Sequence, residues 1–353
     1  IKKEDLEKKA TIFPIMDGLV FNQSTPYGHK GKSFQGEAFF TAENPPIGAT
    51  IRYYLKDDYK SLKDKRKELE KEKNKSNQAI AYPSKDSMRL EDNEEAPYTL
   101  LIITDEQGNE VRKIKQAAAK GMKQVVWDGR LELTTPVSFH VADADNPYES
   151  EEQGPVALPG KYSAQLIKVE NGVLENLSDK ISFNLTTLSN STLPEVDKVK
   201  LAASNKSLAE FRRVVMGTDQ FVGSMNERIK FLKAGIQKGP SSSMSFMAEL
   251  KTIENQLKNV ILEMHGDRSI SKREFETLSG IVGSVETIVG GTWNQSLGMT
   301  GTFDEKLNEI KPKFKTVYNL VVDLNTKLIS LENKLEDLKL PATPGRLPKW
   351  NGQ

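Results

Sequence analysis

The side chains that most often carry protein chemistry are few in this sequence and lie far apart. The three histidines, His29, His140 and His265, fall in three different regions, and none has a partner at a metal-ligand spacing such as H-x-x-x-H. The chain has no cysteine, which excludes disulfides, thiolate metal sites and thiol nucleophiles. We therefore expect no catalytic residue, no metal site and no cofactor site in this chain.

One loop gathers acidic side chains that could bind a cation or act as the paired carboxylates of a glycoside hydrolase. The stretch Asp143-Ala-Asp-Asn146 begins like a calcium-binding loop. However, Tyr148 stands where such a loop requires glycine, and Gly154 stands where it requires a bidentate glutamate. A solvated loop is therefore the favoured interpretation, with calcium binding and hydrolysis as the alternatives. The carboxylates of this loop are Asp143, Asp145, Glu149, Glu151 and Glu152.

The bulk properties and the absence of familiar catalytic motifs indicate a chain that binds rather than reacts. No G-x-S-x-G motif, P-loop or dinucleotide fingerprint is present. The 50 basic and 49 acidic residues give a net charge of +1, so no overall field attracts nucleic acid or an anionic membrane. No run approaches 18 apolar residues, and we predict no transmembrane segment.

The first large region of the chain has the pattern of β-strands. From about residue 34 to residue 188, short apolar runs with a two-residue period alternate with turn residues, as in Tyr98–Thr104 and Lys123–Trp127. Asn171-Gly172 is a strong hairpin signal. We predict an antiparallel immunoglobulin-like β-sandwich over residues 34–188, with Trp127 in its core.

A charged segment interrupts this β region over about residues 57–95. Its first part, Asp57–Ser76, has helical composition and few apolar residues. Acidic residues alternate with the lysines at spacings that allow ion pairs within one helix. We therefore favour a projecting helix that is solvated and self-paired, and a partner-binding arm is the alternative.

The second large region is helical. After a polar linker that ends at Pro194, the apolar period changes from two to about 3.5 residues, which predicts an antiparallel four-helix bundle over residues 195–340. The capping boxes Ser271–Glu274 and Thr302–Glu305 should open the third and fourth helices, and Pro312 should kink the fourth or mark its start. Expected inward positions include Leu208, Val215, Met225 and Leu232 in the first helix, Leu250, Ile253 and Leu257 in the second, Phe275, Leu278 and Val285 in the third, and Val321, Leu324 and Leu328 in the fourth.

Five side chains are candidates for contact with a protein partner. Phe221, Phe231, Ile281 and Ile288 fall outside the main helical seams. Each of these four therefore belongs either to a second core row or to a contact surface. The fifth, Trp350, belongs to a Pro-rich tail over residues 341–353, which we expect to lie over another surface.

Several motifs between residues 10 and 186 recur together in one known family. They are Thr11–Asp17, Gly36–Lys56, Tyr82–Asp86, Thr104–Arg112, Gly121–Asp128 and Gly154–Tyr162. These motifs resemble the region that follows the propeller in bacterial sortilin-like proteins, which are often labelled glycosyl hydrolases with BNR-type repeats. The order Asp-x-x-Gly-Asn, Trp-Asp-Gly and Pro-Gly-x-Tyr is also similar to the immunoglobulin-like module of flagellar hook-capping proteins.

The resemblance implies an architecture that extends beyond this chain. A β-propeller would precede Ile1, so residues 1–33 would be a linker from it. The protein would be exported, to the periplasm, the outer membrane surface or the medium. Any hydrolase activity would concern the propeller, and no catalytic residue is transferred to this chain. We therefore predict a non-catalytic structural and binding region that contacts the propeller and a protein partner in the envelope; the alternative is an accessory region of a secreted carbohydrate-active hydrolase.

Overall fold

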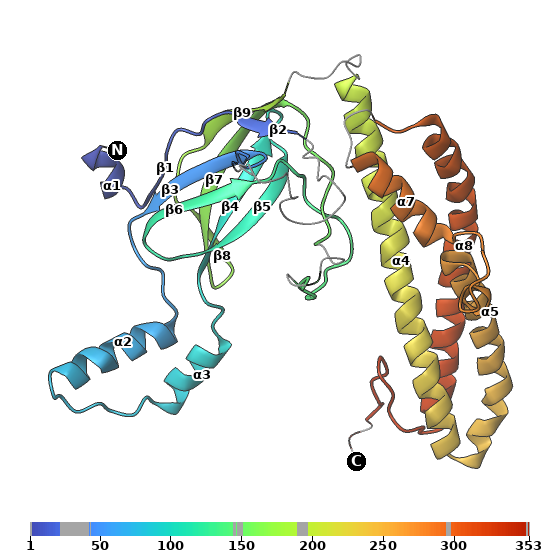
Figure 1. The fold of residues 1–353 in the computed structure, drawn as a ribbon. Helices are drawn as coiled ribbons and strands as arrows, with labels where there is room; N and C mark the ends of the chain where they lie inside the picture. The colour runs from blue at the N-terminus through green and yellow to red at the C-terminus, as the bar shows by residue number, and fades with distance from the viewer. Residues whose placement is uncertain are drawn as a thin grey trace, which may run out of the picture. The chain divides into compact units, whose positions relative to one another are not determined.

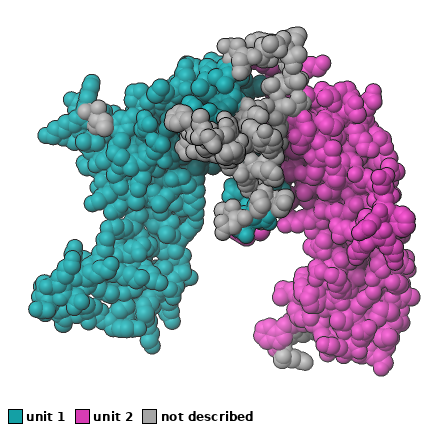
Figure 2. Space-filling model, in the orientation of Figure 1, with its two compact units in different colours: residues 1–133, 142–195 teal, residues 134–141, 196–353 magenta. Residues whose placement is uncertain are grey.

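The chain is a mixed α and β protein that divides into two compact units. The computed structural model describes residues 2–21, 42, 44–143, 146, 151–188, 197–293, 298–350 and 352. Unit 1 comprises residues 1–133 and 142–195, and unit 2 comprises residues 134–141 and 196–353 (Figure 2). Unit 1 contains the strands, and unit 2 contains the long helices (Figure 1).

The described strands of unit 1 form two sheets. The smaller sheet has the order β1-β3-β6, and the larger has the order β2-β9-β7-β4-β5, with β8 paired to β7. All neighbours are antiparallel except β2 and β9, which are parallel. Residues 10–12 and 18–20, which lie within the predicted linker, are strands of these sheets. The bounds are β1 (Ala10–Ile12), β2 (Gly18–Val20), β3 (Ala49–Leu55), β4 (Tyr98–Asp105), β5 (Glu110–Ala117), β6 (Gly121–Trp127), β7 (Gly160–Glu170), β8 (Val173–Asn176) and β9 (Ile181–Thr187), preceded by a short helix α1 (Lys3–Glu7).

The core of unit 1 lies between the two sheets. Alternate residues of β3 are fully buried, as expected for a strand with one face on a core. The Trp127 ring of β6 packs edge to face against Tyr162 of β7 and Phe183 of β9, with ring centroids 5.0 and 6.0 Å away. The prediction that Trp127 lies in the core is confirmed.

The two sheets are joined at one edge by a close backbone contact. Leu19 of β2 and Gly48 exchange two backbone hydrogen bonds of 3.1 and 2.7 Å. Gly48 has a φ of 88°, and a Cβ atom there would lie 1.9 Å from the carbonyl oxygen of Trp127. Only glycine therefore fits this junction. The sheets consequently form one curled surface around their common core.

The hairpin predicted at Asn171-Gly172 is present, but it leads to an additional strand. Both residues have positive φ, 50° and 75°, which is the conformation that a tight two-residue hairpin turn requires. The turn joins β7 to β8, and β9 follows after a second bend. The sequence pattern did not predict β8, because the strand has only four residues and most of them are exposed.

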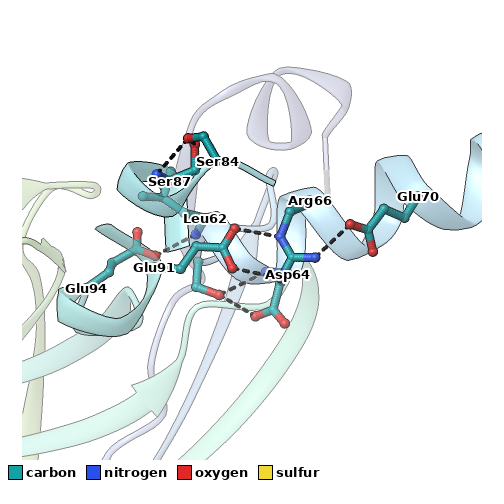
Figure 3. Close-up of polar contacts among 9 residues, drawn as sticks. Leu62, Asp64, Arg66, Glu70, Ser84, Ser87, Glu91 and Glu94 are labelled. Carbon is teal, nitrogen blue, oxygen red and sulfur yellow. Dashed lines mark hydrogen bonds and ion pairs between the residues drawn. The ribbon is translucent and has the colours of Figure 1, made fainter. Parts of the chain in front are cut away.

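Two helices, α2 (Leu62–Lys75) and α3 (Lys85–Asn93), project from the sheets between β3 and β4 (Figure 1). The guanidinium of Arg66 donates hydrogen bonds of 2.6 and 2.8 Å to Glu91 of α3 and one of 2.7 Å to Glu70 (Figure 3). Lys60 pairs with Asp58 and Glu68, so these contacts and Arg66–Glu70 lie within the segment that was predicted to pair with itself. Arg66 also pairs with Glu91, so it joins α2 to α3, which the charge pattern did not predict.

Unit 2 is built from long helices that pack on one another. Asp197 caps the first of them, since its carboxylate accepts hydrogen bonds from the N–H groups of Val199 and Lys200. Thr300 caps the last by accepting from the N–H of Phe303. The bounds are α4 (Lys198–Lys238), a 3₁₀ turn η2 (Ser241–Phe246), α5 (Met247–His265), a short α6 (Arg268–Ser271), α7 (Ile281–Trp293) and α8 (Gly301–Asp337).

Helices α5 and α7 pack against successive segments of α4. Glu254 and His265 of α5 pair with Lys233 and Asp219 of α4, so α5 runs antiparallel to α4. Glu286 of α7 pairs with Arg212, further toward the start of α4. The second and third helices of the predicted bundle therefore follow one another along α4 instead of standing side by side, while α8 packs against both.

The capping boxes were placed incorrectly by the sequence pattern. Residues 272–280, which include part of the predicted third helix, are not helical. Phe275 and Leu278, predicted to face the core, are exposed. The last helix begins at Gly301, so Thr300 and not Thr302 is its cap, and Pro312 lies inside it. Most other predicted seam positions are buried, including Leu208, Met225, Leu257 and Leu324.

Candidate interaction surface

The five candidate contact residues separate into exposed and buried ones. Phe221 and Phe231 of α4 are 40% and 46% exposed, and Trp350 of the tail is 82% exposed. Ile281 and Ile288 of α7 are only 3% and 0% exposed, because α7 packs against both α4 and α8. Of the two interpretations given for these residues, burial supports the second core row for Ile281 and Ile288.

One of the two exposed phenylalanines, Phe221, shares its surface with apolar residues of α8. The rings of Phe211 and Phe314 meet edge to face with centroids 5.5 Å apart, and Arg228 pairs with Glu332. From the first contact to the second, the residue number increases along both helices, so α4 and α8 are parallel neighbours. Phe221 lies seven residues before Arg228, on the side of α4 that meets α8, whereas Phe231 lies ten residues further on and faces another direction. On α8, Tyr318, Val322 and Ile329 lie seven residues before, three before and four after Asn325, the contact of Arg228. All four residues Phe221, Tyr318, Val322 and Ile329 are exposed, and we call them the α4–α8 face.

The spacing of the α8 residues explains why they lie on one side of their helix. On α8, Tyr318, Val322 and Ile329 follow one another by four and seven residues, which places them on one helical stripe. The core residues Val321, Leu324 and Leu328 form a neighbouring stripe. The α8 members of the face were missed, although a second apolar stripe beside the predicted seam could have revealed them.

A polar cluster lies between α4 and α8. The Arg228 guanidinium donates hydrogen bonds of 3.0 and 2.7 Å to Glu332 and one of 3.2 Å to Asn325. Glu332 is buried, so this bidentate pair fixes the register of the two helices. A charge pair of this kind, with both partners occupied, is a structural link and not a reactive group.

The C-terminal tail covers one end of the same side of unit 2. Leu340 packs against Gly235, and the backbone of Gly345 lies against the side chain of Arg228. Arg346 donates hydrogen bonds of 2.8 and 2.9 Å to the carbonyl oxygens of Leu340 and Pro341. The tail therefore lies over unit 2 beyond the polar cluster, whereas the four residues of the α4–α8 face remain exposed.

The residues suspected of chemistry do not converge in the described structure. His265 pairs with Asp219 at 2.6 Å in a contact between two helices, His140 is exposed, and His29 lies outside the described residues. Of the acidic loop, Asp145 and Glu149 also lie outside the described residues, so the calcium hypothesis is not tested. Within the parts that the structure describes, no three metal-binding side chains come together.

Two adjoining pockets open between α7 and α8, and the first also reaches the end of α5. They have volumes of about 380 and 470 Å³, and both are lined by Ser284, Lys306 and Glu309. Glu309 accepts hydrogen bonds from Lys306 and Lys313, at 3.2 and 2.6 Å, which lower its pKa. These two contacts keep Glu309 in its charged form and hold it in place.

Comparison with known proteins gives no assignment. No family model, no curated protein and no solved structure matches this chain. None of the helices in the described parts of the chain is long and apolar enough to span a bilayer.

Proposed function

We propose that this chain is a non-catalytic structural and binding region of an exported sortilin-like propeller protein. In this proposal unit 1 packs on the propeller, and the α4–α8 face of unit 2 docks a protein partner in the envelope. The observation that carries the docking role is the apolar face itself. Its four residues are exposed, although the core sides of α4 and α8 are already complete.

We further propose that unit 1 is a curled variant of the immunoglobulin-like sandwich. Unit 2 would be a variant of the four-helix bundle in which α5 and α7 follow one another along α4. Two features support the first part. The Tyr162 hydroxyl donates a hydrogen bond of 2.7 Å to the carbonyl oxygen of Leu158, four residues upstream, in the manner of a tyrosine corner. Trp127 supplies the buried aromatic anchor between the sheets.

The aromatic content of the α4–α8 face favours a protein as the partner. Tyrosine and phenylalanine are enriched in the centres of protein interfaces, where they lose solvent without leaving charges unpaired. The polar cluster around Arg228 is satisfied internally, so it needs no partner group. A partner with a complementary apolar patch would therefore bury the face without a charge penalty.

Native purification with quantitative mass spectrometry tests the proposal. The variant Phe221→Asp/Val322→Asp should lose a stoichiometric partner that the wild type retains, because two carboxylates would be buried unpaired at the contact. Leu262→Asp, at an exposed apolar residue of α5, is the matched control and should retain the partner. Circular dichroism of each variant establishes that unit 2 stays helical.

Two outcomes would contradict the proposal. Recovery of the same partner at the same stoichiometry with Phe221→Asp/Val322→Asp would exclude the α4–α8 face as the contact. Native protein that lacks any peptide upstream of Ile1 would contradict the link to a propeller. Glycan hydrolysis by the native protein, with no stoichiometric partner, would instead support an accessory region of a hydrolase.

A further inference from the structure

Strand β6 has an edge without a backbone partner. It is one of the two outer strands of the smaller sheet, opposite β1, and pairs only with β3, from Gly121 to Trp127 (Figure 1). Within the described structure, no backbone hydrogen bond reaches residues 121–127 from the side opposite β3. An open edge of seven residues presents a row of free N–H and C=O groups, whose natural ligand is another extended strand.

Strand β5, one of the two outer strands of the larger sheet, is better protected than β6, whose charged residue is the single Lys123. Strand β5 carries Arg112, Lys113 and Lys115, and charged residues of this kind discourage pairing between edges. The N–H of Glu132 also donates a 2.8 Å hydrogen bond to the carbonyl oxygen of Val111 on that strand. By contrast, the solvent side of β6 presents Met122 and Val126, which are 50% and 39% exposed.

The order of residues along β6 is self-complementary about its centre. If two copies of the strand pair antiparallel around a two-fold axis at Gln124, Met122 of each copy faces Val126 of the other. Lys120 then faces Asp128 at both ends, and Lys123 faces Val125. No like charges stand opposite one another, and each outer pair is either apolar or oppositely charged.

We propose that β6 pairs with β6 of a second copy of this chain in this register, so that the two smaller sheets become one continuous sheet. The occupant is a second copy because the same nine positions, residues 120–128, supply both sides of the contact, as an isologous interface requires. Arg52 of β3 already holds the Oε1 atom of Gln124 at 2.9 Å, so the central side chain is oriented before pairing. The inference concerns unit 1 alone and does not depend on the α4–α8 face.

Single-cysteine crosslinking of the full chain tests the register, because the native sequence contains no cysteine. Gln124→Cys should form a disulfide-linked dimer under mild oxidation, since the two Cβ atoms of a directly opposed pair lie about 4.5–5.5 Å apart. Met122→Cys alone should not, because its opposing residue is Val126. A mixture of Met122→Cys and Val126→Cys chains should give the mixed dimer.

Sedimentation of chains without cysteine tests the same contact by a second route. Val126→Lys should raise the dissociation constant of the dimer roughly tenfold, because two symmetric apolar pairs are lost. Val173→Lys, at an exposed residue of β8, is the matched control and should leave it unchanged. Monomeric wild type, or Gln124→Cys that crosslinks no faster than Met122→Cys, would overturn the proposal.

Discussion

Glu254 shows how one side chain can join two helices of unit 2. Its carboxylate, on α5, lies 2.7 Å from Lys233 of α4 and 2.8 Å from Lys251 of its own helix. Hydrogen bonds from these two lysines lower the pKa of Glu254 to about 2. The ionised form of Glu254 is therefore more favourable in the folded state than in the unfolded state, so it stabilises the fold.

This pKa predicts a pH-dependent contribution to stability. Because the pKa is depressed in the folded state, the contribution is present above the ordinary value of 4.5 and is lost as the pH falls toward 2. We expect Glu254→Gln to be less stable than the wild type at pH 6, with the difference shrinking between pH 4.5 and 2. Urea unfolding of both proteins across this range measures it.

The control for Glu254 is a glutamate of the same unit without such partners. Glu305→Gln on α8 replaces an exposed carboxylate and should show little difference from the wild type at any of these pH values. A Glu254→Gln deficit that stayed constant down to pH 2 would mean that the carboxylate contributes by packing rather than by its charge.

Single residues also show the limits of reading this sequence. The seam residues Leu208, Met225 and Leu324 were predicted correctly because burial of one helix face is a local, periodic property. Arg212, which is buried and pairs with Glu286, was not predicted. Such a pair depends on which turns of two distant helices meet, and spacing along one helix contains no information on that.

At the scale of elements, the break between α5 and α7 is the feature that shapes unit 2. The chain leaves α5 at Gly266, makes the short turn α6 and returns to begin α7 at Ile281. A Cβ atom at Gly280 would lie 2.5 Å from both the N atom of Gly266 and the carbonyl oxygen of Met264. The return of the chain thus depends on a backbone contact that only glycine allows.

Alanine at two glycines should have opposite effects on stability. Gly280→Ala forces the backbone apart and should destabilise unit 2 by on the order of 2 kcal/mol. Gly223→Ala, at an exposed position inside α4 where nothing lies near the new methyl group, should stabilise it by about 0.5–1 kcal/mol. Thermal unfolding followed by far-ultraviolet circular dichroism measures both effects.

The Gly280 prediction has a clear contrary outcome. If Gly280→Ala were as stable as the wild type, the close approach of residues 264–266 to residue 280 would not be what closes this loop. The pair of variants separates that effect from a general helix preference for alanine, because Gly223→Ala reports the preference alone.

The same break explains why the third helix was misplaced from the sequence. Ser271–Glu274 has the composition of a capping box, which is a local signal. In the structure Asp267 caps the preceding turn instead, and Glu274 has a positive φ of 63°, so the chain bends where a helix was predicted. The position of α7 is set by packing at the end of α5, which a local motif cannot encode.

At the scale of the whole molecule, the two units have separate cores. The buried cluster of unit 1 is formed by residues between Ala10 and Leu185. In unit 2, α4, α5, α7 and α8 bury their apolar stripes against one another. The change of apolar period near residue 195 predicted this division, because the two kinds of element cannot share one repeat. Residues 134–141, which group with unit 2, were not separated from the β region by any sequence signal.

Separate cores predict that each unit folds without the other. Expressed alone, residues 2–188 should bury Trp127, the only tryptophan of that fragment, and show blue-shifted emission.

Residues 197–353 should be helical and unfold cooperatively, with a modest loss of stability because Thr134 no longer donates its 3.3 Å hydrogen bond to the carbonyl oxygen of Ala209. Residues 197–293 provide the control, since without α8 the apolar stripes of α4, α5 and α7 stay uncovered and cooperative unfolding should be lost. A fragment 197–353 that unfolded without a cooperative transition would show that unit 2 depends on residues 134–141 for its fold.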